Sequence, residues 1–125
     1  MLKMVLGILL SFALLAGLSI YELSFVEHSF AALHDAFQNM YLKTEEESAT
    51  AEDGNAVRIF WQNKKRSLHF WLPHAVIDQI DTQLGEAIGY LYEENYMDAL
   101  PKWQVLVTLS ENIPKTYSLL PENIF

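Results

Sequence analysis

Three side chains in the middle of the chain have the types and spacing that acid–base or metal chemistry requires. His74 and Asp78 are four residues apart, and Asp81 follows three residues later. A histidine held by a carboxylate is the minimal unit of a general base or of a metal shell. Carboxylates are also favoured in the first turns of a helix by its dipole. A catalytic role would need a further polar group converging on these three in a cleft.

The other titratable clusters suit catalysis less. His28 and His34 are six residues apart, so they cannot share a helix face as a ligand pair. His69 lies near Trp71 and the basic cluster 64–66, which indicates packing or exposure to solvent. The acidic run 45–47 is typical of a solvated surface. We therefore predict no catalytic residue, no metal site and no cofactor.

Known catalytic motifs are also absent from the sequence. It contains no glycine-rich phosphate loop, no His-Glu-x-x-His and no serine-hydrolase elbow. Gly85 and Gly89 are four residues apart inside a helical pattern, where they predict close helix packing rather than a ligand site. We expect that the protein is not an enzyme.

Composition excludes some classes of partner and chemistry. The chain has 125 residues and a formal net charge of −8, and it contains no cysteine. Such a surface as a whole repels nucleic-acid phosphates and anionic lipid headgroups, so we expect no nucleic-acid partner. Without cysteine there is no disulfide, thiolate nucleophile or zinc–thiolate site.

Residues 4–21 form a run of eighteen residues without a charge. As a helix it is about 27 Å long, close to the thickness of the hydrocarbon layer of a bilayer. We expect domain 1–21 to be a retained single-pass membrane anchor; a cleaved signal ending near Gly17 and Ser19, and a buried core helix, are the alternatives. Lys3 precedes the run and Glu22 follows it, so the N-terminus is expected in the cytoplasm and the rest outside it.

An apolar seam with heptad spacing follows the anchor. It consists of Leu23, Val26, Phe30, Leu33, Phe37 and Met40. This pattern predicts an amphipathic stalk helix over 22–50, whose seam needs another helix of the chain or a second copy as its partner. The polar stretch 44–55 ends in Asp53-Gly54-Asn55, which is typical of a turn.

Three shorter helices are predicted in domain 55–125. They span residues 56–71, about 73–93 and 96–112, with Pro73 starting the second and Pro114 closing the third. The apolar tail 117–125 is expected to pack back onto them. The fold class is therefore all-α, with two antiparallel hairpins in a small tetratricopeptide-like bundle.

Aromatic residues concentrate in these helices and form the candidate interaction surface. Its members are Trp61, Trp71, Tyr90, Tyr96 and Trp103. Most are expected in the core, but together they could also line a concave groove for a peptide or small ligand.

The order of several short segments is similar to a known family. They are Trp71-Leu72-Pro73-His74, Asn95-Tyr96-Met97-Asp98-Ala99, Asn112-Ile113-Pro114 and Asn123-Ile124-Phe125. With the N-terminal anchor, the chain resembles the bacterial domain of unknown function 4363 family, small singly anchored helical proteins of spore-forming Gram-positive bacteria. Two departures are visible: Trp71-Leu72-Pro73-His74 is less polar than the turn expected there, and Asn112 stands where the family usually has histidine.

The resemblance implies no activity, and at most a membrane protein of the cell envelope as partner. We therefore expect an extracytoplasmic helical module that acts through protein–protein contact, as part of a homo-oligomer or with an envelope protein. A small-ligand or peptide sensor using the aromatic groove is the alternative.

Overall fold

The computed structural model describes the backbone of residues 1–117 and the side chains of residues 1–18 and 25–116. Its four helices are α1 (Leu2–Glu45), α2 (Ala51–Leu68), α3 (His74–Tyr92) and α4 (Tyr96–Tyr117). Residues 1–117 contain no strand, which confirms the all-α prediction. The predicted tail 117–125 lies outside the described residues, apart from the backbone of Tyr117.

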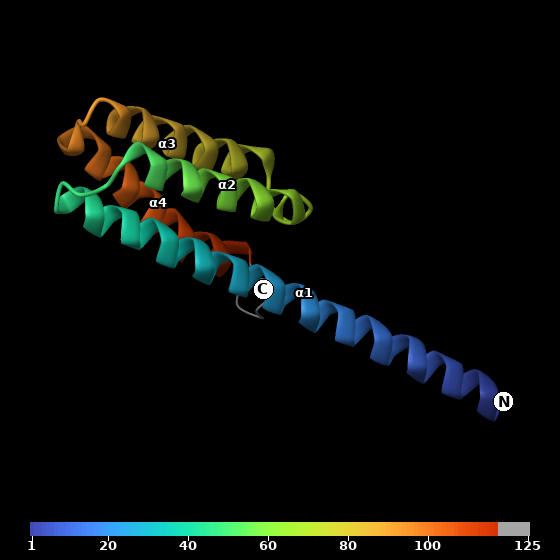
Figure 1. Cartoon of the computed structure of the whole chain (residues 1–125). Coiled ribbons are helices and arrows are strands. Elements are labelled where there is room, and N and C mark those ends of the chain that lie inside the picture. Colours follow the sequence, from blue (N-terminus) through green and yellow to red (C-terminus); the bar gives the residue numbers. More distant parts are fainter. Residues whose placement is uncertain (118–125) are drawn as a thin grey trace.

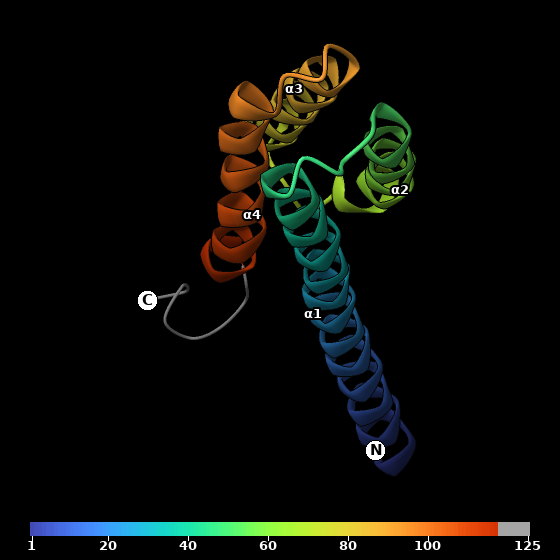
Figure 2. The same cartoon turned by 60° about the vertical axis from the view of Figure 1, so that its left-hand side comes forward.

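The helices run alternately up and down, and α1 extends far beyond the other three (Figure 1). The most extensive contacts join α1 to α4 and α3 to α4, while α2 packs on α3 and more lightly on α1. In a tetratricopeptide array, consecutive hairpins stack on their neighbours. Here the first and last helices pair and close a four-helix bundle, with α4 beside α1 in both views (Figure 2).

The predicted seam is the half of α1 that enters the bundle. Phe30, Leu33, Phe37 and Met40 are at most 2% exposed, and Val26 is partly buried. The side chain of Leu23 lies outside the described residues. The partner left open by the sequence is therefore α4 with α2, and the predicted stalk is one of the four bundle helices.

Helix α2 begins earlier than predicted, and the turn expected at residues 53–55 is wrong. Thr50 and Asp53 form a capping box: the Asp53 backbone N–H donates to Thr50 Oγ1, and the Thr50 N–H donates to Asp53 Oδ2, both at 3.1 Å. Gly54 belongs to the helix and is buried. A Cβ at this position would lie only 2.8 Å from Ile88 Cγ1 on α3. The glycine permits close approach of α2 and α3.

Helix α2 ends at Leu68, three residues before the predicted end, whereas α3 and α4 begin close to where they were predicted. Pro73 caps α3, and Asn95 caps α4 by accepting the Asp98 backbone N–H at 3.2 Å. Two turns reverse the chain with a glutamate in the left-handed region, Glu47 at φ 58° and Glu94 at φ 54°. Pro114 does not close α4, which continues to Tyr117 while the neighbouring Ile113 stays buried.

Candidate interaction surfaces

Residues 2–18 of α1, here called the bare segment, contact no other helix. All of them are exposed, and their large apolar side chains point in every direction around the helix, with Leu10 65% and Phe12 68% exposed. Helix α1 is continuous, and its C-terminal half is packed in the bundle. The bare segment therefore projects away from the bundle (Figure 2). An extended apolar surface is therefore left uncovered by the described residues.

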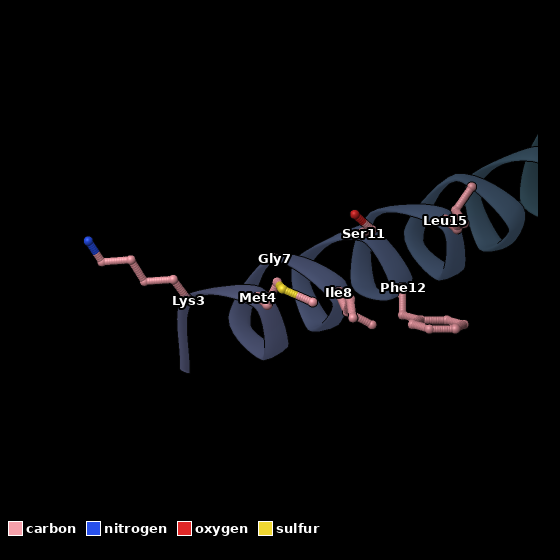
Figure 3. A pocket seen from close by; sticks show the side chains of 7 residues that line it. All are labelled: Lys3, Met4, Gly7, Ile8, Ser11, Phe12 and Leu15. Atoms are coloured by element: carbon pink, nitrogen blue, oxygen red, sulfur yellow. The ribbon is translucent and has the colours of Figure 1, made fainter. Parts of the chain in front are cut away.

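Glycine and serine leave a shallow hollow on the bare segment. It has a volume of about 450 Å³ and is lined by Lys3, Met4, Gly7, Ile8, Ser11, Phe12 and Leu15. Figure 3 shows these residues along a single helix, and all of them belong to α1. No heavy atom lies within 4 Å of a Cβ built at Gly7, so this side of the helix can be approached closely.

Part of the predicted anchor, residues 19–21, has side chains outside the described residues. Among the residues whose side chains are described, no helix has a stretch long and apolar enough to cross a membrane. Helix α1 passes the predicted boundary between residues 21 and 22 without interruption. The membrane anchor stays a prediction.

The five predicted aromatic residues do not form one surface. Trp61 and Trp103 are 1% and 0% exposed, and the Trp103 ring packs against Phe37 with ring centres 6.5 Å apart. Tyr90 and Tyr96 are partly buried against the same core. Only Trp71 is exposed, at 42%. The predicted groove is filled because tryptophan at these positions fills the space between helices.

The three residues with acid–base spacing do not converge. Asp81 Oδ1 accepts a hydrogen bond from Trp61 Nε1 at 2.6 Å, and its Oδ2 lies 2.7 Å from Lys65 Nζ. His74 packs edge-on against His69, with ring centres 4.7 Å apart. Asp78 is exposed. Asp81 therefore links α2 to α3, and the described residues contain no group of three metal-ligating side chains.

A polar hollow of about 360 Å³ lies beside this link. It is lined by Arg58, Trp61, Gln62, Lys65, Asp81, Leu84 and Gly85. A Cβ built at Gly85 or Gly89 meets nothing within 4 Å, so the predicted close helix packing at these glycines is wrong. Glycine at 85 instead leaves part of this hollow open.

Two further links between helices were not predicted from the sequence. His34 Nε2 on α1 lies 2.9 Å from Glu111 Oε1 on α4, and His34 Nδ1 lies 3.8 Å from Asp35 Oδ1. The two partners are 77 residues apart in the chain, so no local sequence pattern predicts this pair. A second link joins Lys102 Nζ on α4 to Glu86 Oε2 on α3 at 2.7 Å. This hydrogen bond raises the pKa of Lys102 above its usual value.

A comparison with protein families identifies one match. A family described as "Domain of unknown function (DUF4363)" matches residues 18–124, which confirms the resemblance seen in the sequence. The comparisons with curated proteins and with solved structures found no match. The match begins inside the apolar run and covers the whole bundle.

Proposed function

This chain belongs to the domain of unknown function 4363 family, and we propose that it is a membrane-tethered helical module that acts through protein contact rather than catalysis. The bare segment is the tether, and the bundle is the part held at the membrane surface. One observation carries the proposal: one continuous helix has an uncovered apolar segment at one end and a sealed core at the other.

A water-soluble helix buries one apolar stripe and leaves its other faces polar. The bare segment has apolar side chains on all faces, and residues 4–21 contain no charge. Such a helix is stable in hydrocarbon, where it satisfies its own backbone hydrogen bonds. Lys3 before the run and acidic residues after it favour an extracytoplasmic bundle in the cell envelope.

The bundle itself supports a role in contact. Its candidate acid–base residues do not converge: Trp61 and Lys65 engage Asp81, His74 packs against His69, and Asp78 is exposed. The sensor alternative relied on an aromatic groove, but Trp61 and Trp103 are buried and cannot line one. An envelope protein or a second copy of the chain is the partner we propose.

Membrane tethering is tested by a charge placed in the bare segment. Phe12→Arg puts a charge near the centre of the uncharged run, at a cost of about 3 kcal/mol for insertion. We expect this variant to leave the membrane fraction after an alkaline wash, while the parent chain stays in it. Ile59→Arg is the control, since Ile59 is similarly exposed (60% against 68%) but lies on the bundle. Equal retention of both variants would contradict the tether.

The contact role is tested in intact membranes of the host. Amine crosslinking through Lys43, Lys64, Lys65 or Lys102 followed by mass spectrometry should recover one reproducible partner. Crosslinks confined to copies of this chain identify a homo-oligomer instead. Recovery of the chain without any crosslink to itself or to another protein would contradict the contact role.

A further inference from the structure

The up-and-down order of the helices gives the bundle two different ends. The α1–α2 turn (46–50) and the α3–α4 turn (93–95) lie at the end away from the bare segment, here called the far end (Figure 1). The α2–α3 turn (69–73) lies at the near end, from which the bare segment projects (Figure 1). Whatever surrounds the bare segment is therefore close to the α2–α3 turn.

This turn presents two aromatic side chains on a fixed backbone. Phe70 is 84% and Trp71 is 42% exposed, while the flanking Leu68 and Leu72 are buried. The backbone N–H groups of Trp71 and Leu72 donate to the Leu68 carbonyl at 2.9 and 3.0 Å. The buried leucines thus hold the turn in place, and tryptophan is a residue enriched at the membrane–water interface.

Basic side chains precede the aromatic pair. Arg66 is exposed and forms no ion pair with the described residues, and Lys64 Nζ lies 5.6 Å from the centre of the Phe60 ring. Lys65 is engaged by Asp81. Lys64 and Arg66 are therefore the two charges of this cluster that remain available to an anionic surface.

Acidic charge gathers at the other end of the bundle. Half of the sixteen acidic residues lie in or beside the far-end turns: Glu45, Glu46, Glu47, Glu52, Asp53, Glu93, Glu94 and Asp98. The acidic groups nearer the α2–α3 turn include Glu27, Asp78 and Asp81, and Asp81 is paired with Lys65. An anionic surface therefore repels the far end most strongly and favours approach by the near end.

The length of α1 brings the near end close to a bilayer. Ser29, the first fully buried residue among the described side chains, lies eight positions after the end of the uncharged run at residue 21. These positions span about 12 Å of helix, and the headgroup layer on each side of a bilayer is about 5–7 Å thick, so the bundle begins about 5–7 Å beyond that layer. A continuous helix thus holds the bundle within reach of the headgroups.

We propose that the α2–α3 turn, through Phe70, Trp71, Lys64 and Arg66, docks onto the anionic headgroup surface of the bilayer that holds the bare segment. This docking rests on the proposed tether. It fixes the tilt of α1 and the bundle relative to the membrane, with the far-end turns facing away from it. A partner would then meet the far end and the exposed sides of the bundle.

Three serines give matched probes, because the chain contains no cysteine. Ser11→Cys lies in the bare segment, Ser67→Cys beside the α2–α3 turn, and Ser48→Cys at the far end. Each full-length variant carries a fluorophore and is reconstituted in vesicles of phosphatidylcholine and phosphatidylglycerol containing nitroxide-labelled lipid. We expect quenching of the labels at 11 and 67, and none at 48. The vesicles contain no other protein, so quenching reports lipid contact alone.

Arg66→Gln in the Ser67→Cys chain tests the charge. Loss of one basic residue should weaken docking about five-fold, and Arg58→Gln, which lies on the same helix farther from the turn, should have little effect. Trp71→Ala should also reduce quenching at 67. In vesicles of phosphatidylcholine alone, quenching at 67 should fall while quenching at 11 persists.

The outcomes separate this proposal from the tether. Quenching at 11 with no difference between 67 and 48 overturns the docking and leaves the tether intact. Absence of quenching at 11 overturns both. If quenching at 67 is unchanged both by Arg66→Gln and by removal of the anionic lipid, the role of the basic residues is overturned.

Discussion

The two halves of α1 are parts of one helix with opposite surroundings. In the bare segment, Leu9 and Phe12 are 61% and 68% exposed, whereas Phe30 and Leu33 in the bundle half are 1% and 0% exposed. Both halves are rich in apolar residues. They differ in how these residues are distributed around the helix, because a single stripe can be covered by neighbouring helices and an apolar cylinder needs apolar surroundings on every side. Apolar content alone therefore says little about where a helix is buried.

The largest expected effect compares one leucine from each half. Leu33→Ala removes a fully buried side chain and should lower the free energy of unfolding of the bundle by about 2–5 kcal/mol. Leu9→Ala, at an exposed site, should change it by less than about 0.5 kcal/mol. Both are measured by denaturant unfolding in a mild detergent, followed by circular dichroism. Similar losses in the two variants would mean that the bare segment is also packed.

Two glycines sharpen the same comparison. A Cβ at Gly54 would lie 2.8 Å from Ile88 Cγ1 in the core, so Gly54→Ala should destabilise the bundle by about 1–3 kcal/mol. Gly7→Ala meets nothing within 4 Å and should only favour the helix, by up to about 1 kcal/mol. Ile88→Ala combined with Gly54→Ala should recover part of the loss that the two substitutions cause separately. Thermal unfolding of the four variants tests this, and an additive double variant would exclude the clash.

The smallest expected effect is a pH dependence confined to the bundle. The Thr50 backbone N–H, helped by the Thr50 hydroxyl and Lys43, lowers the pKa of Asp53 below its ordinary value of 3.8. A lowered pKa in the folded state contributes stability above the unfolded value, and this contribution is lost as the pH falls through the folded one. Loss of this N-cap interaction lowers the free energy of unfolding by about 1 kcal/mol.

Stability should therefore decline below about pH 4 in the parent chain. In Asp53→Asn this decline should be shallower, since asparagine keeps an acceptor but does not titrate. Residues 4–18 contain no titratable side chain, so the helical signal of the bare segment should not follow this titration. A decline of the same steepness in Asp53→Asn would assign the acid sensitivity to other carboxylates.

Much of the bundle could be predicted because its signals are local. The seam from Phe30 to Met40, the apolar face of α3 and the cap at Asn95 all follow from neighbours three or four residues apart. The capping box at Thr50 and Asp53 was also a local signal, but Asp53-Gly54-Asn55 suggested a turn more strongly. Only the position of Ile88 on another helix explains why a glycine is needed inside α2.

The candidate surfaces were less predictable for the same reason. An exposed tryptophan and a buried one have similar local patterns, so burial of Trp61 and Trp103 and exposure of Trp71 required the packed bundle. Likewise, the side chains that engage Asp81 come from another helix, sixteen and twenty residues away in the chain.

Local sequence determined where the helices of this chain form, which stripe of the bundle half of α1 is apolar, and that residues 4–21 contain no charge. Tertiary structure decided that α4 covers the seam, that the aromatic groove is filled, and that acidic and aromatic–basic turns lie at opposite ends. The physical reason is the distance along the chain over which the two kinds of interaction act. Helical hydrogen bonds and side-chain spacing act over four residues, whereas the choice of partner depends on which distant surfaces fit together and exclude water.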